Sequence, residues 1–148
     1  RGHFAEALVA SLLEGASFAE HGAAPCDLNW DCITIAVRAT GSRSTDHDRS
    51  GVKPAFAGNW KFPPKQAWNM ETHDWDAGEP RRCHADVAVL AFHDGFDIDQ
   101  DWSFFVLSRM QIEEYPSLSI TPQSLRRAGF ENVEAGDLAV QVKKVAGK

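Results

Sequence analysis

Asp31 opens a hydrophobic, strand-like run that extends from residue 31 to residue 40, and carboxylates of this kind bind Mg²⁺. Residues two apart on a strand share one face, so Ala36 and Arg38 point to the same side. Metal-dependent hydrolysis of a phosphodiester needs carboxylates to hold the metal and a group that orients or deprotonates water. Ala36 has no ligand atom, whereas Arg38 can contact a phosphate bidentately but does not deprotonate. The run therefore combines one possible metal ligand, Asp31, with one possible phosphate contact, Arg38.

A second acid, Glu6, comes from an amphipathic helix predicted over residues 4–18 and could reach the same metal. Each of these residues also has a purely structural interpretation. Asp31 can cap the loop before the strand, Glu6 can be a solvated helix residue, and Arg38 can be the partner in a surface ion pair. The residues taken one at a time therefore leave catalysis open.

The remaining elements form an α/β pattern around this strand. The near-continuous apolar run 85–93 predicts a central strand, and 102–108 predicts a strand beside it. Thr121, Pro122 and Gly129 predict the N-cap, first turn and end of a short helix. The tail 138–145 fits a helix or a strand, and residues 41–82 form a long irregular segment rich in Gly and Pro. We expect one domain with a central mixed β-sheet flanked by helices.

Several short motifs, taken in order, resemble the PD-(D/E)xK nuclease superfamily, which has the restriction-endonuclease-like fold. The resemblance covers roughly residues 4–127 and depends on the order and spacing of the pieces. The matching pieces are Ala5-Glu6, Trp30-Asp31, Ile35-Ala36-Val37-Arg38-Ala39-Thr40, Arg82-Cys83-His84-Ala85-Asp86-Val87-Ala88-Val89, Trp102-Ser103-Phe104-Phe105-Val106-Leu107 and Ser117-Leu118-Ser119.

The resemblance implies a role for each matched position. Asp31 takes the place of the metal-binding Asp, and Glu6 that of a helix Glu which assists the metal. Ala36 stands where the second acid belongs, and Arg38 where the catalytic lysine belongs. We therefore expect a nuclease-like domain impaired in cleavage that binds nucleic acid or a protein.

The alternative is an active Mg²⁺- or Mn²⁺-dependent endonuclease of the restriction or defence type, with migrated catalytic residues. Whether the chain is an enzyme stays open at this point. The possible substitutes are Glu71, Asp74, Lys65 and Gln66. A further pattern, Asp137 with Gln141 and Lys143, has similar spacing but comes too late in the chain. A terminal amphipathic element is the better interpretation of that pattern.

Composition narrows the class of protein. The net charge of −6 argues against an extended coat of basic residues, although residues 38–82 hold eight Lys or Arg against six Asp or Glu. Three cysteines without CxxC pairs favour a reducing, cytoplasmic setting without a disulfide framework, and a zinc site using His84 fits no usual spacing. We expect no membrane span, DNA as the partner with RNA or a protein as alternatives, and Mg²⁺ or Mn²⁺ as cofactor if the domain is active.

Overall fold

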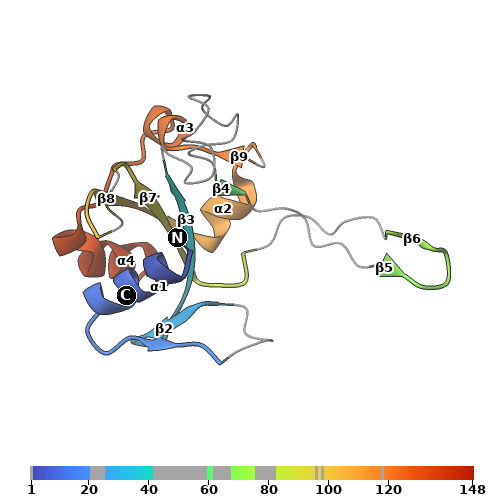
Figure 1. Cartoon of the computed structure of the whole chain (residues 1–148), viewed down its shortest axis with the longest axis horizontal. Helices are drawn as coiled ribbons and strands as arrows, with labels where there is room; N and C mark the ends of the chain where they lie inside the picture. Colours follow the sequence, from blue (N-terminus) through green and yellow to red (C-terminus); the bar gives the residue numbers. More distant parts are fainter. Residues whose placement is uncertain are drawn as a thin grey trace.

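A five-stranded mixed β-sheet with helices on both faces forms the centre of the molecule, in a computed structural model of the chain (Figure 1). The structure describes residues 2–20, 26–41, 60–61, 68–75, 83–95, 97, 99–117 and 119–148. The strands lie in the order β1-β2-β3-β7-β8, where β3 and β7 are parallel and the other neighbours antiparallel. Their bounds are β1 Ser17–Phe18, β2 Leu28–Trp30, β3 Ile33–Gly41, β7 Val87–His93 and β8 Trp102–Ser108. The predicted α/β class with a mixed sheet is confirmed.

The first two strands of the site region form a tight hairpin. Trp30 pairs with Ile33 across a two-residue turn, in which Asp31 and Cys32 have φ values of 47° and 62°. Such left-handed conformations at both central positions match the twist of hairpin strands, and Asp tolerates them better than most residues. The strand predicted to begin at Asp31 therefore begins at Ile33 instead, and Asp31 belongs to the turn.

The two strongest strand predictions are confirmed by β7 and β8. Every β7 side chain except Phe92 is buried, as expected for a strand covered on both faces. Strand β8 has the predicted bounds, whereas β7 begins two residues later than the predicted 85–93. The sheet is thus centred on β3 and β7, the strands that carry the residues of chemical interest.

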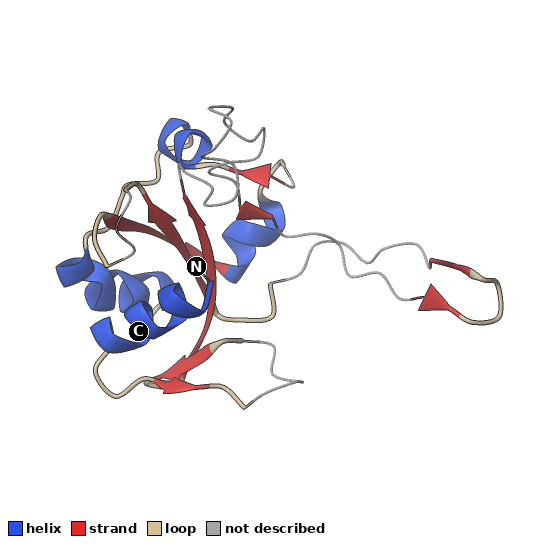
Figure 2. Cartoon of the chain, in the orientation of Figure 1, coloured by secondary structure: helices blue, strands red, loops and turns tan. Residues whose placement is uncertain are grey.

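Two apolar clusters lie on opposite faces of this sheet. Figure 2 shows helices on both of these faces. The first cluster includes Ile35 and Val37 of β3 and is covered by α1 (Gly2–Leu12) and α4 (Leu138–Ala146). The second includes Ala36 and is covered by α2 (Arg109–Glu114), α3 (Pro122–Arg127) and the pair β4 (Trp60–Lys61) and β9 (Ser119–Ile120). Alternate residues of β3 therefore face different layers.

The helix predictions hold with one correction. Helix α1 ends at Leu12 rather than near Phe18; Gly15 has φ 84° in the turn that follows, and Ser17–Phe18 pairs in the sheet. Helix α3 has Thr121 as N-cap and Pro122 in its first turn, as predicted. The tail forms helix α4, preceded by a 3-10 turn at Ala135–Asp137.

Most of the segment predicted to be irregular, residues 41–82, lies outside the described residues. Its described part includes a small hairpin of β5 (Trp68–Asn69) and β6 (Asp74–Trp75), which Figure 1 shows away from the five-stranded sheet. Among the described residues, no helix is long and apolar enough to cross a bilayer.

Candidate active site

The residues predicted to form the site lie on different parts of the fold. Asp31 lies in the β2–β3 turn, is 62% exposed and forms an ion pair with Lys143 of α4, at 3.2 Å between Oδ2 and Nζ. Glu6 lies on α1, where its carboxylate is 3.8 Å from the imidazole of His3. Arg38 shares the Ala36 face, opposite the face covered by α1. Five residues of strand, about 17 Å, separate Ile33 from Arg38.

A different carboxylate, Asp27, accompanies Arg38. Asp27 immediately precedes β2, and the pairing of Leu28 with Ile35 places Asp27 opposite Ala36. Nη1 of Arg38 lies 3.2 Å from Oδ2 of Asp27, and the main-chain N–H of Val37 donates to the same oxygen at 2.7 Å. The Asp27 main-chain N–H also donates to the carbonyl of Ile35. The side chain is therefore fixed by an extension of the β2–β3 ladder.

These contacts limit the chemistry available to Asp27. A guanidinium remains protonated at any physiological pH, so it neutralises the carboxylate and does not serve as a base. A main-chain donor also occupies Oδ2, the oxygen that accepts from Arg38. Ala36 is only 4% exposed and adds no ligand atom beside this pair. The pair thus has the geometry of an ion pair rather than of an open metal site.

A second carboxylate, Asp86, lies at the same end of the sheet. Its Oδ2 accepts hydrogen bonds from the main-chain N–H and the hydroxyl of Thr34, both at 3.0 Å. Its Oδ1 is 3.2 Å from Nη2 of Arg109. The hydrogen bond from the Thr34 N–H, with smaller contributions from the Thr34 hydroxyl and Arg109, holds the pKa of Asp86 below its usual value despite some desolvation. Asp86 therefore ties β3, β7 and the start of α2 together as an ionised group.

Both carboxylates, Asp27 and Asp86, influence the pKa of Cys26. Burial raises the pKa of its thiol first, and the negative charges of Asp27 and then Asp86 raise it further. Both acids are thus close enough to influence one side chain on this part of the sheet. Oδ2 of Asp27 and both carboxylate oxygens of Asp86 are nevertheless already engaged by cations or by N–H and O–H donors.

The donor set does not suit the Mg²⁺ or Mn²⁺ that the nuclease resemblance implies. Such ions take several free oxygen ligands, whereas Asp27 and Asp86 already hold donors and Ala36 supplies none. Within the described ranges no group of three or more His, Cys, Asp or Glu side chains could hold a metal ion. Of the substitutes considered, Glu71 and Asp74 belong to the hairpin away from β3, and residues 65 and 66 lie outside the described residues (Figure 1).

The late Asp-Gln-Lys pattern lies at the start of helix α4 and along it, so the tail that fits a helix or a strand by its sequence is a helix. Lys143 points to the β2–β3 turn, with Nζ 5.1 Å from the ring centre of Trp30 and 3.2 Å from Asp31. Asp137 and Gln141 instead line a separate depression beside β8. The spacing that would place Gln141 and Lys143 on one face of a strand separates them on a helix.

Sequence reasoning did not select Asp27 or Asp86 as site residues. For Asp27 the available signal is the hairpin. If residues 31 and 32 are recognised as a two-residue turn, counting back along both strands places Asp27 opposite Ala36. For Asp86 the signal was its place at the start of a buried strand, where an unpaired carboxylate would be costly.

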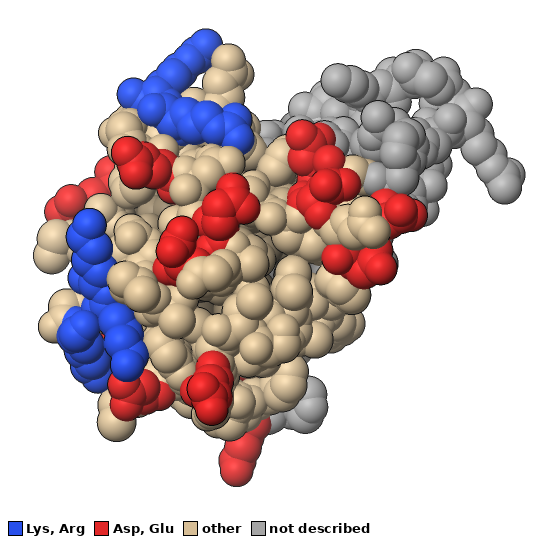
Figure 3. Space-filling model, turned by 90° about the vertical axis from the view of Figure 1, so that its left-hand side faces the viewer, with Lys and Arg blue, Asp and Glu red and all other residues tan. Residues whose placement is uncertain are grey.

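Charged side chains on the face seen in Figure 3 do not form one continuous basic strip among the described residues. Lys and Arg gather in two groups, and acidic side chains lie between and beside them. Helices α3 and α4 each carry two basic residues in the last turn, which are Arg126 and Arg127 in α3 and Lys143 and Lys144 in α4. Contacts to a phosphate backbone on this face would therefore be local.

Comparison with known proteins supports the fold. No protein-family profile matches the chain. No curated protein matches it at a significant level either. Among solved structures, the chain is similar to that of a bacterial homing endonuclease, I-Ssp6803I, with a TM-score of 0.58 over 99% of this chain and 94% of that one. The sequence identity is 12%, so this likeness establishes an endonuclease fold and nothing further about activity.

Proposed function

We propose that this protein is a nuclease-like domain of the PD-(D/E)xK type that binds DNA but is impaired in phosphodiester cleavage. The observation that carries the proposal is the arrangement on β3: Ala36 opposite Asp27, and Arg38 bound to that same Asp27. An endonuclease fold supplies the context. In this context Asp27 replaces Asp31 as our candidate for the ancestral metal-binding acid.

The physical argument for impairment concerns charge. A metal at Asp27 would have to compete with a guanidinium that is permanently charged and already 3.2 Å from the carboxylate. Without a carboxylate at position 36, a metal ion would gain one acid while being repelled by Arg38. Arg38 is better suited to contact a phosphate of bound nucleic acid once it leaves Asp27.

An active enzyme with migrated residues is the second candidate, and Asp86 is the observation that favours it. Asp86 is ionised, and it lies near enough to Asp27 for both to act on Cys26. Activity would require Arg38 and Arg109 to leave these two carboxylates when nucleic acid binds. This candidate predicts that Asp27→Asn and Asp86→Asn each abolish cutting.

Cleavage tests separate the two candidates. Supercoiled plasmid and structured RNA are incubated with the protein in Mg²⁺ and, separately, in Mn²⁺, alongside Asp27→Asn and Asp31→Asn as matched variants. We expect no cutting above the background of the two variants. Robust cutting that disappears in Asp27→Asn would favour the active enzyme, and cutting that disappears only in Asp31→Asn would restore Asp31 as the metal ligand.

Binding is tested by measuring the affinity for duplex DNA as the salt concentration rises. Each neutralised phosphate contributes a slope of about −0.9 to the plot of log affinity against log salt. We expect a shallow slope that corresponds to a few phosphate contacts. In Arg38→Gln the slope should correspond to about one contact fewer. Undetectable binding at low salt would contradict the nucleic-acid part of the proposal and leave a protein-interaction role. Tighter binding to RNA than to DNA would replace DNA with RNA as the proposed partner.

A further inference from the structure

Strand β8 is an edge of the five-stranded sheet, and part of its outer side is left unpaired. Phe104 forms one antiparallel pair outside the sheet: its N–H donates to the carbonyl of Val133 at 3.1 Å, and the Val133 N–H donates back at 2.7 Å. Main-chain groups alternate in direction along a strand, so Val106 points the same way as Phe104. None of the described residues forms a hydrogen bond with the main chain of Val106.

The segment that contains Val133 separates from β8 near Val106 for a structural reason. Continuing the antiparallel pair would place Glu131 opposite Val106. Instead, the N–H of Phe130 donates to the carbonyl of Leu125 in α3, and the Phe130 ring packs against the second apolar cluster, whereas Val133 belongs to the first. This segment therefore crosses the sheet edge between Phe130 and Val133 and, among the described residues, pairs with β8 only at Val133.

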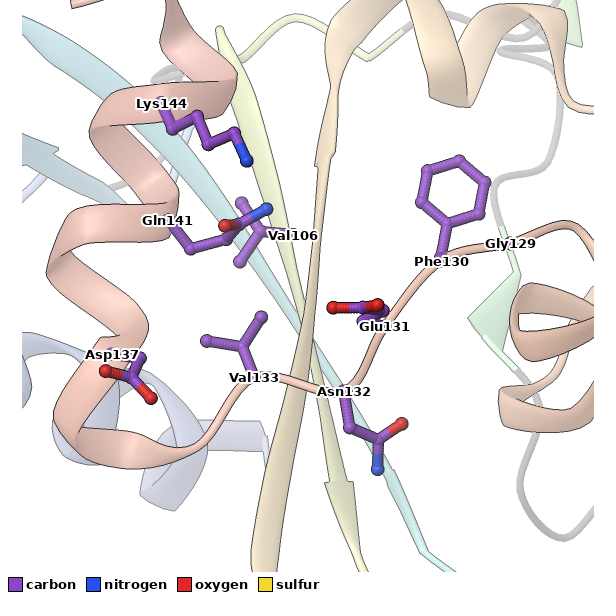
Figure 4. A pocket seen from close by; sticks show the side chains of 9 residues that line it. All are labelled: Val106, Gly129, Phe130, Glu131, Asn132, Val133, Asp137, Gln141 and Lys144. Carbon is purple, nitrogen blue, oxygen red and sulfur yellow. The ribbon is translucent and has the colours of Figure 1, made fainter.

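This crossing leaves a pocket of about 500 Å³ against Val106, within the usual range of ligand sites. Figure 4 shows it between α4 and the chain that follows Gly129. Gln141 and Lys144 extend from α4 toward β8 on one side, and the Glu131 carboxylate lies on the other. Asp137 lines the α4 side of the pocket, below Gln141 in that view.

The charges of the pocket favour a basic ligand. Glu131 and Asp137 supply two carboxylates against the single ammonium of Lys144. In the part of the chain that the structure describes, none of these three forms an ion pair. The two carboxylates also disfavour a phosphate backbone at this place, which distinguishes the pocket from the basic end of α3.

We infer that the pocket binds an extended peptide of a partner protein, which pairs its backbone with Val106 and directs Lys or Arg side chains to Glu131 on one side of the pocket and to Asp137 on the other. Addition of a strand to a sheet edge uses the main-chain donor and acceptor that Val106, which is 4% exposed, presents to the pocket. Because the neighbouring Phe104 is already paired with Val133, the peptide pairs over a short length and its side chains determine specificity. The inference is independent of cleavage and of DNA binding.

The test is selection from a phage-displayed library of random linear peptides, followed by synthesis of the enriched peptides. We expect sequences with a recurring Lys or Arg, whose affinity falls roughly tenfold in Val106→Pro. Proline removes the outward N–H without removing a bond to β7, a position where edge strands accept it. Glu131→Lys should weaken the same peptides by a comparable factor, and Asp27→Asn, on the other face, should leave them unchanged.

A second arm covers the case in which Val106→Pro does not fold, as judged by its thermal melt. The enriched peptide is then resynthesised with alternate backbone amides methylated, which blocks strand pairing while keeping the side-chain charges. Equal binding by the methylated and unmethylated peptides overturns the inference. So does the absence of enriched peptides, or enrichment of acidic peptides or of sequences indifferent to Glu131→Lys.

Discussion

Two aspartates four residues apart, Asp27 and Asp31, each lie beside a cation at 3.2 Å, yet their surroundings differ. Asp27 is 28% exposed, extends the β2–β3 ladder and accepts a hydrogen bond from the Val37 N–H; Asp31 is 62% exposed and lies in a turn. The first pair lies beside the buried Ala36, whereas the second joins the hairpin to α4. The sequence motif points to Asp31 as the site residue, whereas the register of the β2–β3 hairpin points to Asp27.

The largest expected effect is the loss of protein stability when Asp27, rather than Asp31, is replaced. Asp27→Ala leaves the buried N–H of Val37 without its acceptor and Arg38 without its partner, so we expect a loss of about 2 kcal/mol in the free energy of unfolding. Urea denaturation measures it. Asp27→Asn is the control, because an amide oxygen still accepts from Val37; a loss as large as that of Asp27→Ala would show that charge rather than the main-chain bond dominates.

A smaller effect is expected at Asp86, the residue that immediately precedes β7 and accepts hydrogen bonds from Thr34 of β3. Its folded pKa lies below the unfolded value, so it adds stability above about pH 4 that is lost as the pH falls through the folded pKa. Asp86→Asn should reduce the free energy of unfolding by about 1 kcal/mol at pH 7, a figure discounted for its partial exposure. The variant should also be less sensitive to acid between pH 5 and pH 2.

Thr34→Val provides the matched test of the Asp86 mechanism. It removes the hydroxyl, which donates to the Asp86 carboxylate and accepts from the Asp86 main-chain N–H, but keeps the Thr34 main-chain N–H, the larger cause of the lowered pKa. Chemical denaturation across pH should show that this variant retains most of the acid sensitivity of the unmodified chain. A variant as insensitive to acid as Asp86→Asn would contradict the dominant role of the main-chain bond.

The smallest effect is expected at Asp31. Asp31→Asn removes the charge facing Lys143 and keeps a residue that tolerates the left-handed turn, so we expect a loss below about 0.5 kcal/mol that vanishes in high salt. Thermal melts at low and high salt measure it. A loss equal to that of Asp27→Ala would reverse the comparison between the two aspartates.

The sequence predicted the framework of the fold more fully than the site. Apolar runs identified β7 and β8, and capping residues identified α3, because these signals are local. Helix α2 was missed although Ser108 and Gln111 form its capping box. The site is harder to predict, because the proximity of Asp27 to Arg38 depends on a two-residue turn. The apolar pattern places the residues of that turn in the strand itself.

The most direct test of the central claim restores the missing groups and asks which aspartate they need. Plasmid cleavage in Mg²⁺ is measured for Ala36→Glu with Arg38→Lys, alone and combined with Asp27→Asn or Asp31→Asn. The proposal predicts that the double variant gains cutting over the unmodified chain, that Asp27→Asn abolishes the gain and that Asp31→Asn preserves it. Cutting by the unmodified chain that requires Asp31 and not Asp27 would contradict it.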